Sequence, residues 1–166
     1  MQTTIYMTRH GETEENSRGV FQGQTPGHLS EKGKEEARSL CPRLASMTFD
    51  VVLCSDLKRC LDTAEIALDG IECTFIKEPL LRERDLGNLA GTPIKGAVYN
   101  DTVETEESMQ ERARMFIEKV KKEYPGKKVL AFSHGFFCRI LQAEIEGVTH
   151  RDVTLMGNCE IREFTV

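Results

Sequence analysis

The sequence of 166 residues lacks any run of 18 consecutive apolar residues, so we expect no transmembrane helix and no membrane partner. Its first residues, MQTTIYMTRHGETEEN, contain no basic region followed by an apolar stretch, which argues against a signal peptide. Positive charge is not in excess either, because 22 lysines and arginines face 27 acidic residues and give a net charge of -5. Since nucleic-acid binders usually carry a basic face, we do not expect a nucleic-acid partner.

No two of the six cysteines form a C-x-x-C pair, and they are scattered through apolar runs. This pattern favours reduced, buried thiols in a cytoplasmic protein over a disulfide or a zinc site. Internal repeats, low-complexity tracts and long Pro/Gly linkers are also missing. A chain of this length can bury roughly two-thirds of its unfolded surface without a disulfide or a metal, so we expect one domain over 1–166.

Short apolar β-rich runs alternate with amphipathic helical patterns along the chain. The three clearest strand candidates are Thr4–Thr8, Val51–Cys54 and Val129–Phe132, with weaker candidates at Cys73–Ile76 and Ile161–Val166. Apolar residues recur with helical spacing after Ser30, after Ser55, from Met109 to Val120 and from Gly135 to Glu146. Continuously apolar strands are typical of a parallel sheet covered on both faces. We therefore predict an α/β fold, a three-layer α/β/α sandwich with a mostly parallel central sheet.

Charged and histidine residues follow the three clearest strands directly. The first strand runs into Arg9 and His10, the second leads to Arg59, and the third leads to His134. Because ligands of open parallel sheets bind beyond the carboxyl ends of the strands, we expect these side chains to meet at one edge. Two arginines, two histidines and helix N-termini are suited to a phosphate dianion. The charged loop that contains Glu83 is expected to lie nearby.

Four sequence blocks identify a family resemblance. They are Thr8–Thr13 with Asn16, Cys54–Ala64, Leu81–Glu83 with Gly87 and Gly91, and Ser133–Gly135. In this order, and spread over almost the whole chain, they resemble the signature of the histidine phosphatase superfamily, the phosphoglycerate-mutase-like family, and in particular its small phosphatase branch. The resemblance implies a phosphoglycerate-mutase-like fold and a phosphoryl-transfer active site.

The resemblance also implies a role for each residue. His10 would attack the phosphoryl group and form a phosphohistidine, while Glu83 would act as general acid and then as general base. Charge on the phosphoryl oxygens would be neutralised by Arg9, Arg59 and His134. The expected phosphate- and substrate-binding residues are Arg9, Asn16, Gln22, Gly23, Arg59, Arg84, His134 and Gly135. We expect no metal and no cofactor, because the arginines would neutralise the charge.

Some positions depart from the family pattern and bear on the substrate. Phe136 and Phe137 replace a polar residue after the last His-Gly pair, which predicts an apolar wall in the pocket. Only a short cap or insert, at about 88–124, fits between the acid block and the last block. Because a mutase must exclude water from its phosphohistidine, this small insert favours a phosphatase.

Several alternatives stay open from the sequence. They are mutase-type phosphoryl transfer, dephosphorylation of phosphohistidine proteins, and a non-catalytic phosphate-binding module. A cysteine-dependent phosphatase is excluded, because four residues rather than five separate Cys54 from Arg59. We expect His28 and His150 to be loop or surface histidines. The favoured partner is a small phosphorylated metabolite, while its identity and the oligomeric state stay unknown.

Overall fold

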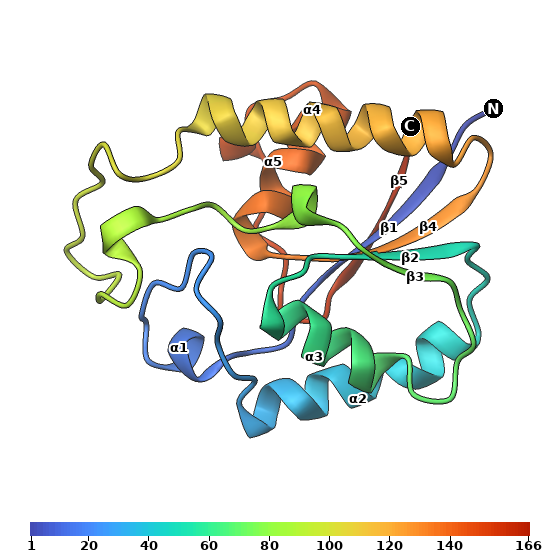
Figure 1. Cartoon of the computed structure of the whole chain (residues 1–166), viewed down its shortest axis with the longest axis horizontal. Helices are drawn as coiled ribbons and strands as arrows, with labels where there is room; N and C mark the ends of the chain where they lie inside the picture. Colours follow the sequence, from blue (N-terminus) through green and yellow to red (C-terminus); the bar gives the residue numbers. More distant parts are fainter.

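A five-stranded sheet of order β3-β2-β4-β1-β5 runs through the centre of the molecule (Figure 1). The computed structural model describes all of residues 1–166. The strands are β1 (Thr4–Arg9), β2 (Val51–Cys54), β3 (Phe75–Lys77), β4 (Lys128–Ser133) and β5 (Ile161–Thr165). Pairing is parallel between β1 and β4, β4 and β2, and β2 and β3, whereas β5 runs antiparallel to β1. The predicted mostly parallel sheet is therefore confirmed.

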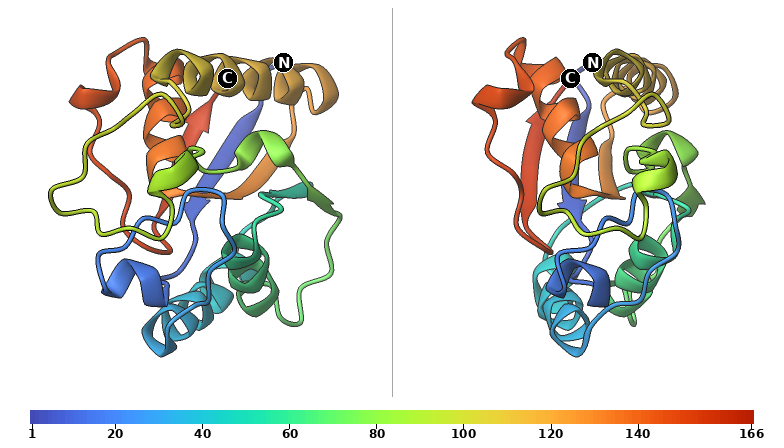
Figure 2. Two further views of the ribbon diagram at one scale, coloured as in Figure 1. Left: turned by 60° about the vertical axis from the view of Figure 1, so that its left-hand side comes forward. Right: turned by 90° about the vertical axis from the view of Figure 1, so that its left-hand side faces the viewer.

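Helices cover both faces of this sheet. They are α1 (Glu14–Ser17), α2 (Glu31–Ala45), α3 (Lys58–Ala67), α4 (Glu106–Glu123) and α5 (Gly135–Glu146), with short 3-10 turns at Pro79–Leu81, Gly87–Leu89 and His150–Asp152. Figures 1 and 2 show α2 and α3 on one face and α4 and α5 on the other. The three-layer α/β/α arrangement agrees with the prediction. The two chain termini lie side by side, because Thr3 and Val166 exchange backbone hydrogen bonds of 2.9 Å.

Local sequence signals explain where the helices begin and end. The Ser30 hydroxyl accepts a hydrogen bond from the Gly33 N–H at the start of α2, and Thr105 caps α4 in the same way. Helix α5 stops at Gly147, whose φ of 67° lies in the left-handed region that glycine adopts without a steric penalty. The observed bounds of α5 are those expected from the sequence.

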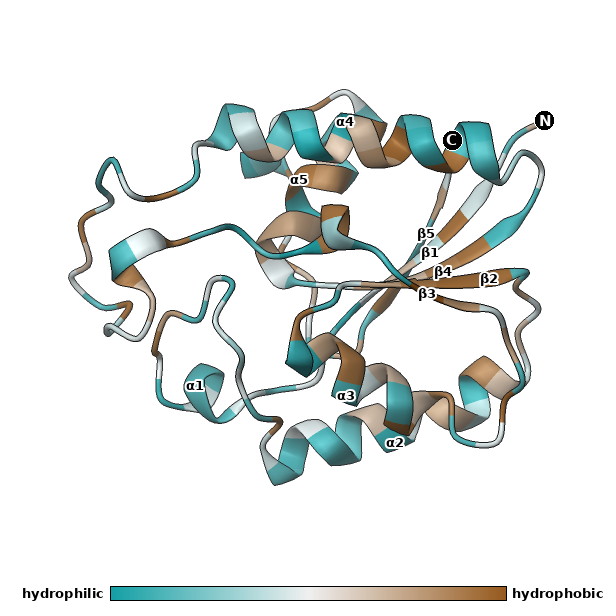
Figure 3. Ribbon diagram, viewed as in Figure 1, coloured by the Kyte–Doolittle hydropathy of each residue, from teal (hydrophilic) through white to brown (hydrophobic).

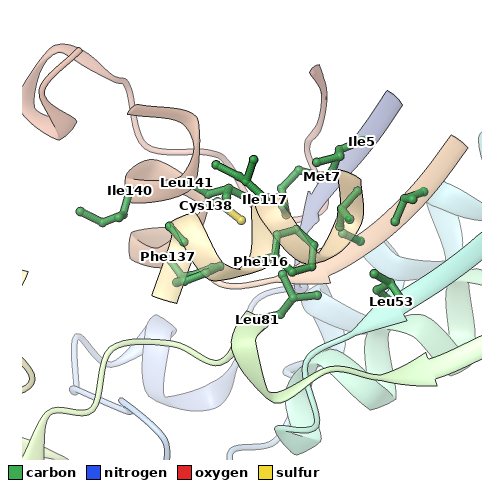
Figure 4. Close-up of a cluster of buried hydrophobic side chains, with 14 of the residues drawn as sticks. Ile5, Met7, Leu53, Leu81, Phe116, Ile117, Phe137, Cys138, Ile140 and Leu141 are labelled. Carbon is green, nitrogen blue, oxygen red and sulfur yellow. The ribbon is translucent and has the colours of Figure 1, made fainter. Parts of the chain in front are cut away.

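The central strands separate two hydrophobic clusters, one on each face of the sheet. Val51 and Leu53 of β2 face α4 and α5, whereas Val52 and Cys54 face α2 and α3. Figure 3 shows the brown, apolar strands between helices whose outer faces are teal. Figure 4 shows the first cluster, in which Phe116 is fully buried. Burial of such a side chain contributes about 1.5–3 kcal/mol to stability.

The segment expected as an insert, 88–124, has two parts. Its second part is α4, whose buried side chains Phe116 and Val120 belong to the cluster above the sheet. Its first part, between the turn at Gly87–Leu89 and α4, has no helix or strand and extends past the carboxyl ends of the strands (Figure 1).

All six cysteines are free thiols, and four of them are buried. Cys41 and Cys73 are only partly buried, so the expectation of buried thiols was wrong for these two. The Cys41 thiol donates to the Ile66 carbonyl of α3 at 3.1 Å, and Cys73 packs against the second hydrophobic cluster. No helix of this structure is both long enough and apolar enough to cross a membrane.

Candidate active site

The carboxyl ends of β1, β2 and β4 lie level with one another at one edge of the sheet. Arg9, the last residue of β1, is in register with Ser133 of β4, and the His10 N–H donates to the Ser133 carbonyl at 3.0 Å. On the other side of β4, the Ser55 N–H donates to the Phe132 carbonyl, also at 3.0 Å. The three parallel strands therefore bring His10 and Ser55 to the same edge, where His134 follows Ser133.

His10 is held as a neutral imidazole with one nitrogen directed at a guanidinium. Its Nδ1 lies 2.7 Å from the Gly11 carbonyl, which can only accept, so we assign the ring proton to Nδ1. Nε2 then carries the lone pair, and it accepts a hydrogen bond from Arg59 Nε at 3.3 Å. Burial lowers the pKa of His10 well below its ordinary range, and the positive charges of Arg59 and Arg9 add to this. The unprotonated form that can act as a nucleophile is the stable one here.

Arg59 is almost completely buried at the start of α3. Its Nη2 donates to the Gly23 carbonyl at 2.6 Å and its Nη1 to the Thr25 carbonyl at 3.0 Å, so the loop around Gly23 is tied to the helix. Burial lowers the pKa of Arg59, and the carboxylate of Glu83 is among the groups that oppose this shift. An arginine remains charged in proteins even so, which makes Arg59 a fixed positive charge beside His10.

Arg9 and Gly135 approach each other closely at the cavity wall. A Cβ on residue 135 would lie 3.1 Å from Arg9 Cζ and 3.1 Å from Arg9 Nε, so glycine is what allows this contact. The Arg9 side chain is anchored by a hydrogen bond from Nη1 to the Met156 carbonyl at 2.7 Å, and its buried Nε has no partner in the protein. As the first residue of α5, Gly135 has no carbonyl in its own helix to receive its N–H.

His134 lies behind His10 and is fully buried. The two ring centroids are 5.2 Å apart with an interplanar angle of 60°, and His134 Nε2 lies 2.7 Å from the Ser55 hydroxyl. Burial lowers the pKa of His134 well below its ordinary range, with contributions from Arg59 and His10. His134 is not among the residues that line the cavity. Direct contact between this residue and a phosphate stays a prediction.

Glu83 lies in an irregular segment and faces the N-terminus of α5. Its carboxylate accepts hydrogen bonds from the N–H groups of Phe136 and Phe137, both at 3.0 Å, and from that of Arg84 at 2.8 Å. These donors are the first free N–H groups of the helix, which attract an anionic group. The carboxylate is thereby fixed in position on the same cavity wall as Gly135.

A cavity of about 320 Å³ joins these groups. Of the predicted site residues, those that line it are Arg9, His10, Asn16, Gln22, Gly23, Arg59, Glu83, Arg84 and Gly135. The rest of its wall is mainly apolar and consists of Val20, Phe21, Leu86, Ile94, Tyr99, Phe136 and Leu155, together with Arg139. The predicted apolar wall is present, but Phe137 is not part of it, because its ring is buried in the cluster above the sheet.

Asn16 and Gln22 belong to one hydrogen-bonded loop at the cavity mouth. The Gln22 amide oxygen accepts from the Thr13 hydroxyl at 2.9 Å and from Asn16 Nδ2 at 3.3 Å. Its amide nitrogen donates to Glu15 Oε2 at 3.1 Å. Because Gln22 is buried and fully engaged in these bonds, it orders the loop, while Asn16 lies at the cavity surface.

Arg84 stands between two aromatic rings at the outer part of the cavity. Its Cζ is 5.1 Å from the centroid of Tyr99 and 5.3 Å from that of Phe136, within the range of a cation–π interaction. Its Nε donates to the Glu104 carbonyl at 2.7 Å. The Arg84 guanidinium is therefore held at the rim, away from the His10–Arg59 pair.

The sequence missed the residues that support His10 from behind. Thr63 accepts a hydrogen bond from the Gly11 N–H at 3.1 Å and donates one to the Arg59 carbonyl at 2.7 Å. Asn158 Nδ2 donates to the His10 carbonyl at 2.9 Å. Thr63 follows Arg59 by four residues, so a helical-spacing argument would have found it, whereas no local signal points to Asn158.

Neither of the two remaining histidines lines the cavity; the expected loop or surface position holds for His28 but was wrong for His150, which begins a 3-10 turn and has a side chain only 12% exposed. His28 is exposed, and the ring of His150 packs edge-on against Phe136 at a centroid distance of 5.7 Å. No group of three or more His, Cys, Asp or Glu side chains is placed to hold a metal ion. A larger hollow of about 650 Å³ lies on the other side of the Arg82–Asp85 segment and contains none of the predicted site residues.

The fold and this edge of the sheet define an α/β protein of the phosphoglycerate-mutase-like class. The solved structure of Bacillus stearothermophilus YhfR superposes with a TM-score of 0.90 over 97% of this chain and 90% of that chain, at 26% sequence identity. The sequence profile of the histidine phosphatase superfamily (branch 1) matches residues 5–166. The chain belongs to the histidine phosphatase superfamily.

Two curated relatives resemble the chain over most of their length. "Uncharacterized phosphatase PhoE" of Bacillus subtilis is 32% identical over 151 residues, which cover 87% of this chain and 78% of PhoE. "Probable phosphoglycerate mutase GpmB" of Enterobacter sp. is 31% identical over 161 residues, which cover 87% of this chain and 75% of GpmB. The relatives thus carry names of phosphatases and of mutases.

Proposed function

We propose that the protein is a metal-independent phosphatase that hydrolyses phosphate monoesters through a phosphohistidine on His10. The observation that carries the proposal is the arrangement of three groups in one cavity: the neutral His10, the Arg59 guanidinium 3.3 Å from its Nε2, and the fixed Glu83 carboxyl group. A nucleophile, a positive charge for the phosphoryl oxygens and a proton carrier are the parts that this reaction requires.

In the first step, His10 Nε2 attacks phosphorus in line with the ester oxygen. The N–P bond forms as the P–O bond breaks, and the alcohol oxygen receives a proton from Glu83, which enters this step in its protonated form and leaves it as the carboxylate. Arg9 and Arg59 neutralise the charge on the equatorial oxygens, and the Gly135 N–H offers a further donor. Because His10 starts without a proton on Nε2, its lone pair needs no general base.

In the second step, water attacks the phosphohistidine. Glu83, now a carboxylate, removes a proton from this water, and the electron pair of the N–P bond returns to His10 Nε2. Inorganic phosphate leaves, and both His10 and Glu83 return to their starting protonation states. One residue can serve as acid and then as base because the same carboxyl group faces the leaving oxygen first and the entering water second.

The cavity supports a small phosphorylated metabolite as the substrate. Its volume of about 320 Å³ is at the lower end of the usual range for small-molecule sites. The phosphate would lie beside His10, and the alcohol part would contact the wall that contains Tyr99 and Phe136. The six free thiols fit a reducing compartment, so we propose a cytoplasmic protein.

Phosphoryl transfer between substrates is the second candidate, because GpmB, a named mutase, is 31% identical. A mutase activity would convert 3-phosphoglycerate into 2-phosphoglycerate in the presence of a bisphosphorylated primer. We expect hydrolysis to be faster than this conversion, because the segment before α4 is short and has no helix or strand, although it contributes Ile94 and Tyr99 to the cavity wall. A coupled assay that detects faster isomerisation than phosphate release would assign the mutase function instead.

The role of Glu83 is tested by the leaving group. We expect Glu83→Gln to reduce kcat/KM for an alkyl phosphate by about 10²-fold or more, because the alkoxide needs a proton, and to affect 4-nitrophenyl phosphate much less. Asp85→Asn is the matched control, since Asp85 lies two residues away in the same loop but outside the cavity. Equal losses for both esters in Glu83→Gln would remove Glu83 from the acid role.

A further inference from the structure

The segment that carries Glu83 has carbonyl groups that no strand or helix satisfies. Leu80 and Leu81 are the last residues of the 3-10 turn Pro79–Leu81, Arg82 and Glu83 lie in the irregular stretch after it, and none of the four forms a ladder with the sheet. A buried carbonyl without a partner is costly, so such a segment needs side-chain donors. Each of the four carbonyls accepts a hydrogen bond from a side chain, and one side chain of another element donates to three of them.

That side chain is Arg112 of α4. Its Nη1 donates to the Leu80 carbonyl at 2.9 Å and to the Arg82 carbonyl at 2.6 Å, and its Nη2 lies 3.3 Å from the Glu83 carbonyl. The Leu81 carbonyl, which points the other way, accepts from the Ser133 hydroxyl at 2.8 Å. The guanidinium of Arg112 thus contacts three of the four carbonyls, and the Glu83 carbonyl also accepts from Gln24 Nε2 at 3.1 Å.

Glu104 contacts Arg112 and the two residues that follow Glu83. It pairs with Arg112 at 2.9 Å, and the two side chains are 12% and 16% exposed. The same carboxylate accepts from the Asp85 N–H at 3.0 Å, while the Glu104 carbonyl accepts from Arg84 Nε at 2.7 Å. Glu104 therefore holds the backbone and the side chain that directly follow Glu83.

The carboxylate of Glu83 is also linked to Arg112, through Phe137. The Phe137 N–H donates to the Glu83 carboxylate at 3.0 Å, and the Phe137 ring lies under the Arg112 guanidinium with a centroid distance of 4.7 Å. Figure 4 shows Phe137 in the same cluster as Leu81, the segment's buried anchor. Arg112 thus contacts both the backbone that carries Glu83 and the helix turn that receives its carboxylate.

We infer that Arg112, with Glu104 as its partner, is a positioning residue that sets the place of the Glu83 carboxyl group and of Arg84 in the active site. The inference rests on the proposed function, in which Glu83 is the general acid and base. Arginine suits this role because its planar group offers five donors in fixed directions, whereas lysine offers one point of charge. A displacement of about 1 Å at a catalytic group can cost about 10²-fold in rate.

The test compares Arg112→Lys, Glu104→Gln and Glu83→Gln in the full chain. The first readout is kcat/KM for 4-nitrophenyl phosphate and for an alkyl phosphate. The second is the inhibition constant of inorganic phosphate, which reports on the His10–Arg59 part of the site. We expect Arg112→Lys to lose about 10- to 100-fold on the alkyl ester and less than about threefold on the nitrophenyl ester. Glu104→Gln should also lower kcat/KM on both esters, and each loss should be smaller than in Arg112→Lys. Arg114→Lys is the control, because Arg114 is half-exposed on the same helix and pairs with Glu111 and Glu144.

The outcomes separate this inference from the proposed function. A leaving-group effect is a larger loss of kcat/KM on the alkyl ester than on the nitrophenyl ester. If Glu83→Gln shows this effect but Arg112→Lys and Glu104→Gln lose equally on both esters, only the positioning role is overturned. Absence of the effect in Glu83→Gln itself would overturn both the acid role and the inference. If Arg112→Lys does not fold, Glu104→Gln decides, since it keeps the size and an acceptor oxygen while removing the charge. A leaving-group effect in that variant, with unchanged phosphate inhibition, supports the inference.

Discussion

Lowering the pH from 7.5 to 5.5 should destabilise the folded protein through His10 and His134. Both have a folded-state pKa that burial holds well below the ordinary 6.5, so below pH 6.5 the unfolded chain binds protons that the folded chain does not. Stability is then lost as the pH falls through 6.5 and downward. Each histidine contributes up to about 1.4 kcal/mol of loss by pH 5.5, and the pair up to about 2.8 kcal/mol.

Urea unfolding at pH 7.5, 6.5 and 5.5, in buffers without phosphate, measures this loss. We expect His10→Gln to reduce the drop in unfolding free energy by up to about 1.4 kcal/mol relative to wild type, since carboxylate titrations are common to both proteins. His28→Gln, on an exposed loop, controls for the removal of a histidine as such. An identical pH dependence in wild type and His10→Gln would refute the assignment of His10 as a buried neutral imidazole.

Two further predictions concern the phosphate site. Hydrolysis of 4-nitrophenyl phosphate should continue at an unchanged rate after treatment with a chelator, because Arg9 and Arg59 supply the positive charge. Loss of activity with the chelator, and its return when a divalent metal is added, would contradict this prediction. Gly135→Ala should weaken inhibition by inorganic phosphate about tenfold, or about 1.4 kcal/mol, because its Cβ would displace the Arg9 guanidinium 3.1 Å away. Unchanged phosphate inhibition would show that the Arg9–Gly135 contact is not part of the site.

Parallel strands made much of the fold and the site's centre predictable from sequence. The runs at β2 and β4 are continuously apolar, as in a parallel sheet covered on both faces, and the carboxyl ends of parallel strands meet at one edge, so the sequence places His10 and Arg59 together. The edge strand β3 was placed two residues too early at its start, because its three residues are all exposed and carry no burial pattern. A hydrophobic sequence pattern cannot locate the ends of a strand whose side chains are all exposed.

The outer cavity could not be predicted, because loop-to-loop pairing creates it. The Phe21 N–H donates to the Thr92 carbonyl at 2.9 Å, and the Gly91 N–H donates to the Phe21 carbonyl at 2.7 Å. These bonds bring the segment that contains Tyr99 over a loop about 80 residues earlier, without any periodic pattern in either one. Helical spacing places Arg112 beside the apolar stripe, three residues after Met109 and four before Phe116, but it cannot predict that the side chain reaches the Glu83 segment.

The central claim is that His10 carries the phosphoryl group during turnover. Rapid mixing of enzyme with a labelled phosphate ester, followed by a denaturing alkaline quench and peptide mass spectrometry, tests it directly, because the N–P bond survives in base. With 4-nitrophenyl phosphate as the labelled ester, we predict phosphate on the peptide that contains His10. Its occupancy should be higher in Glu83→Gln, because this leaving group needs no proton from Glu83 while the attacking water lacks its general base. Turnover without label on His10, or label on another residue, would contradict the account.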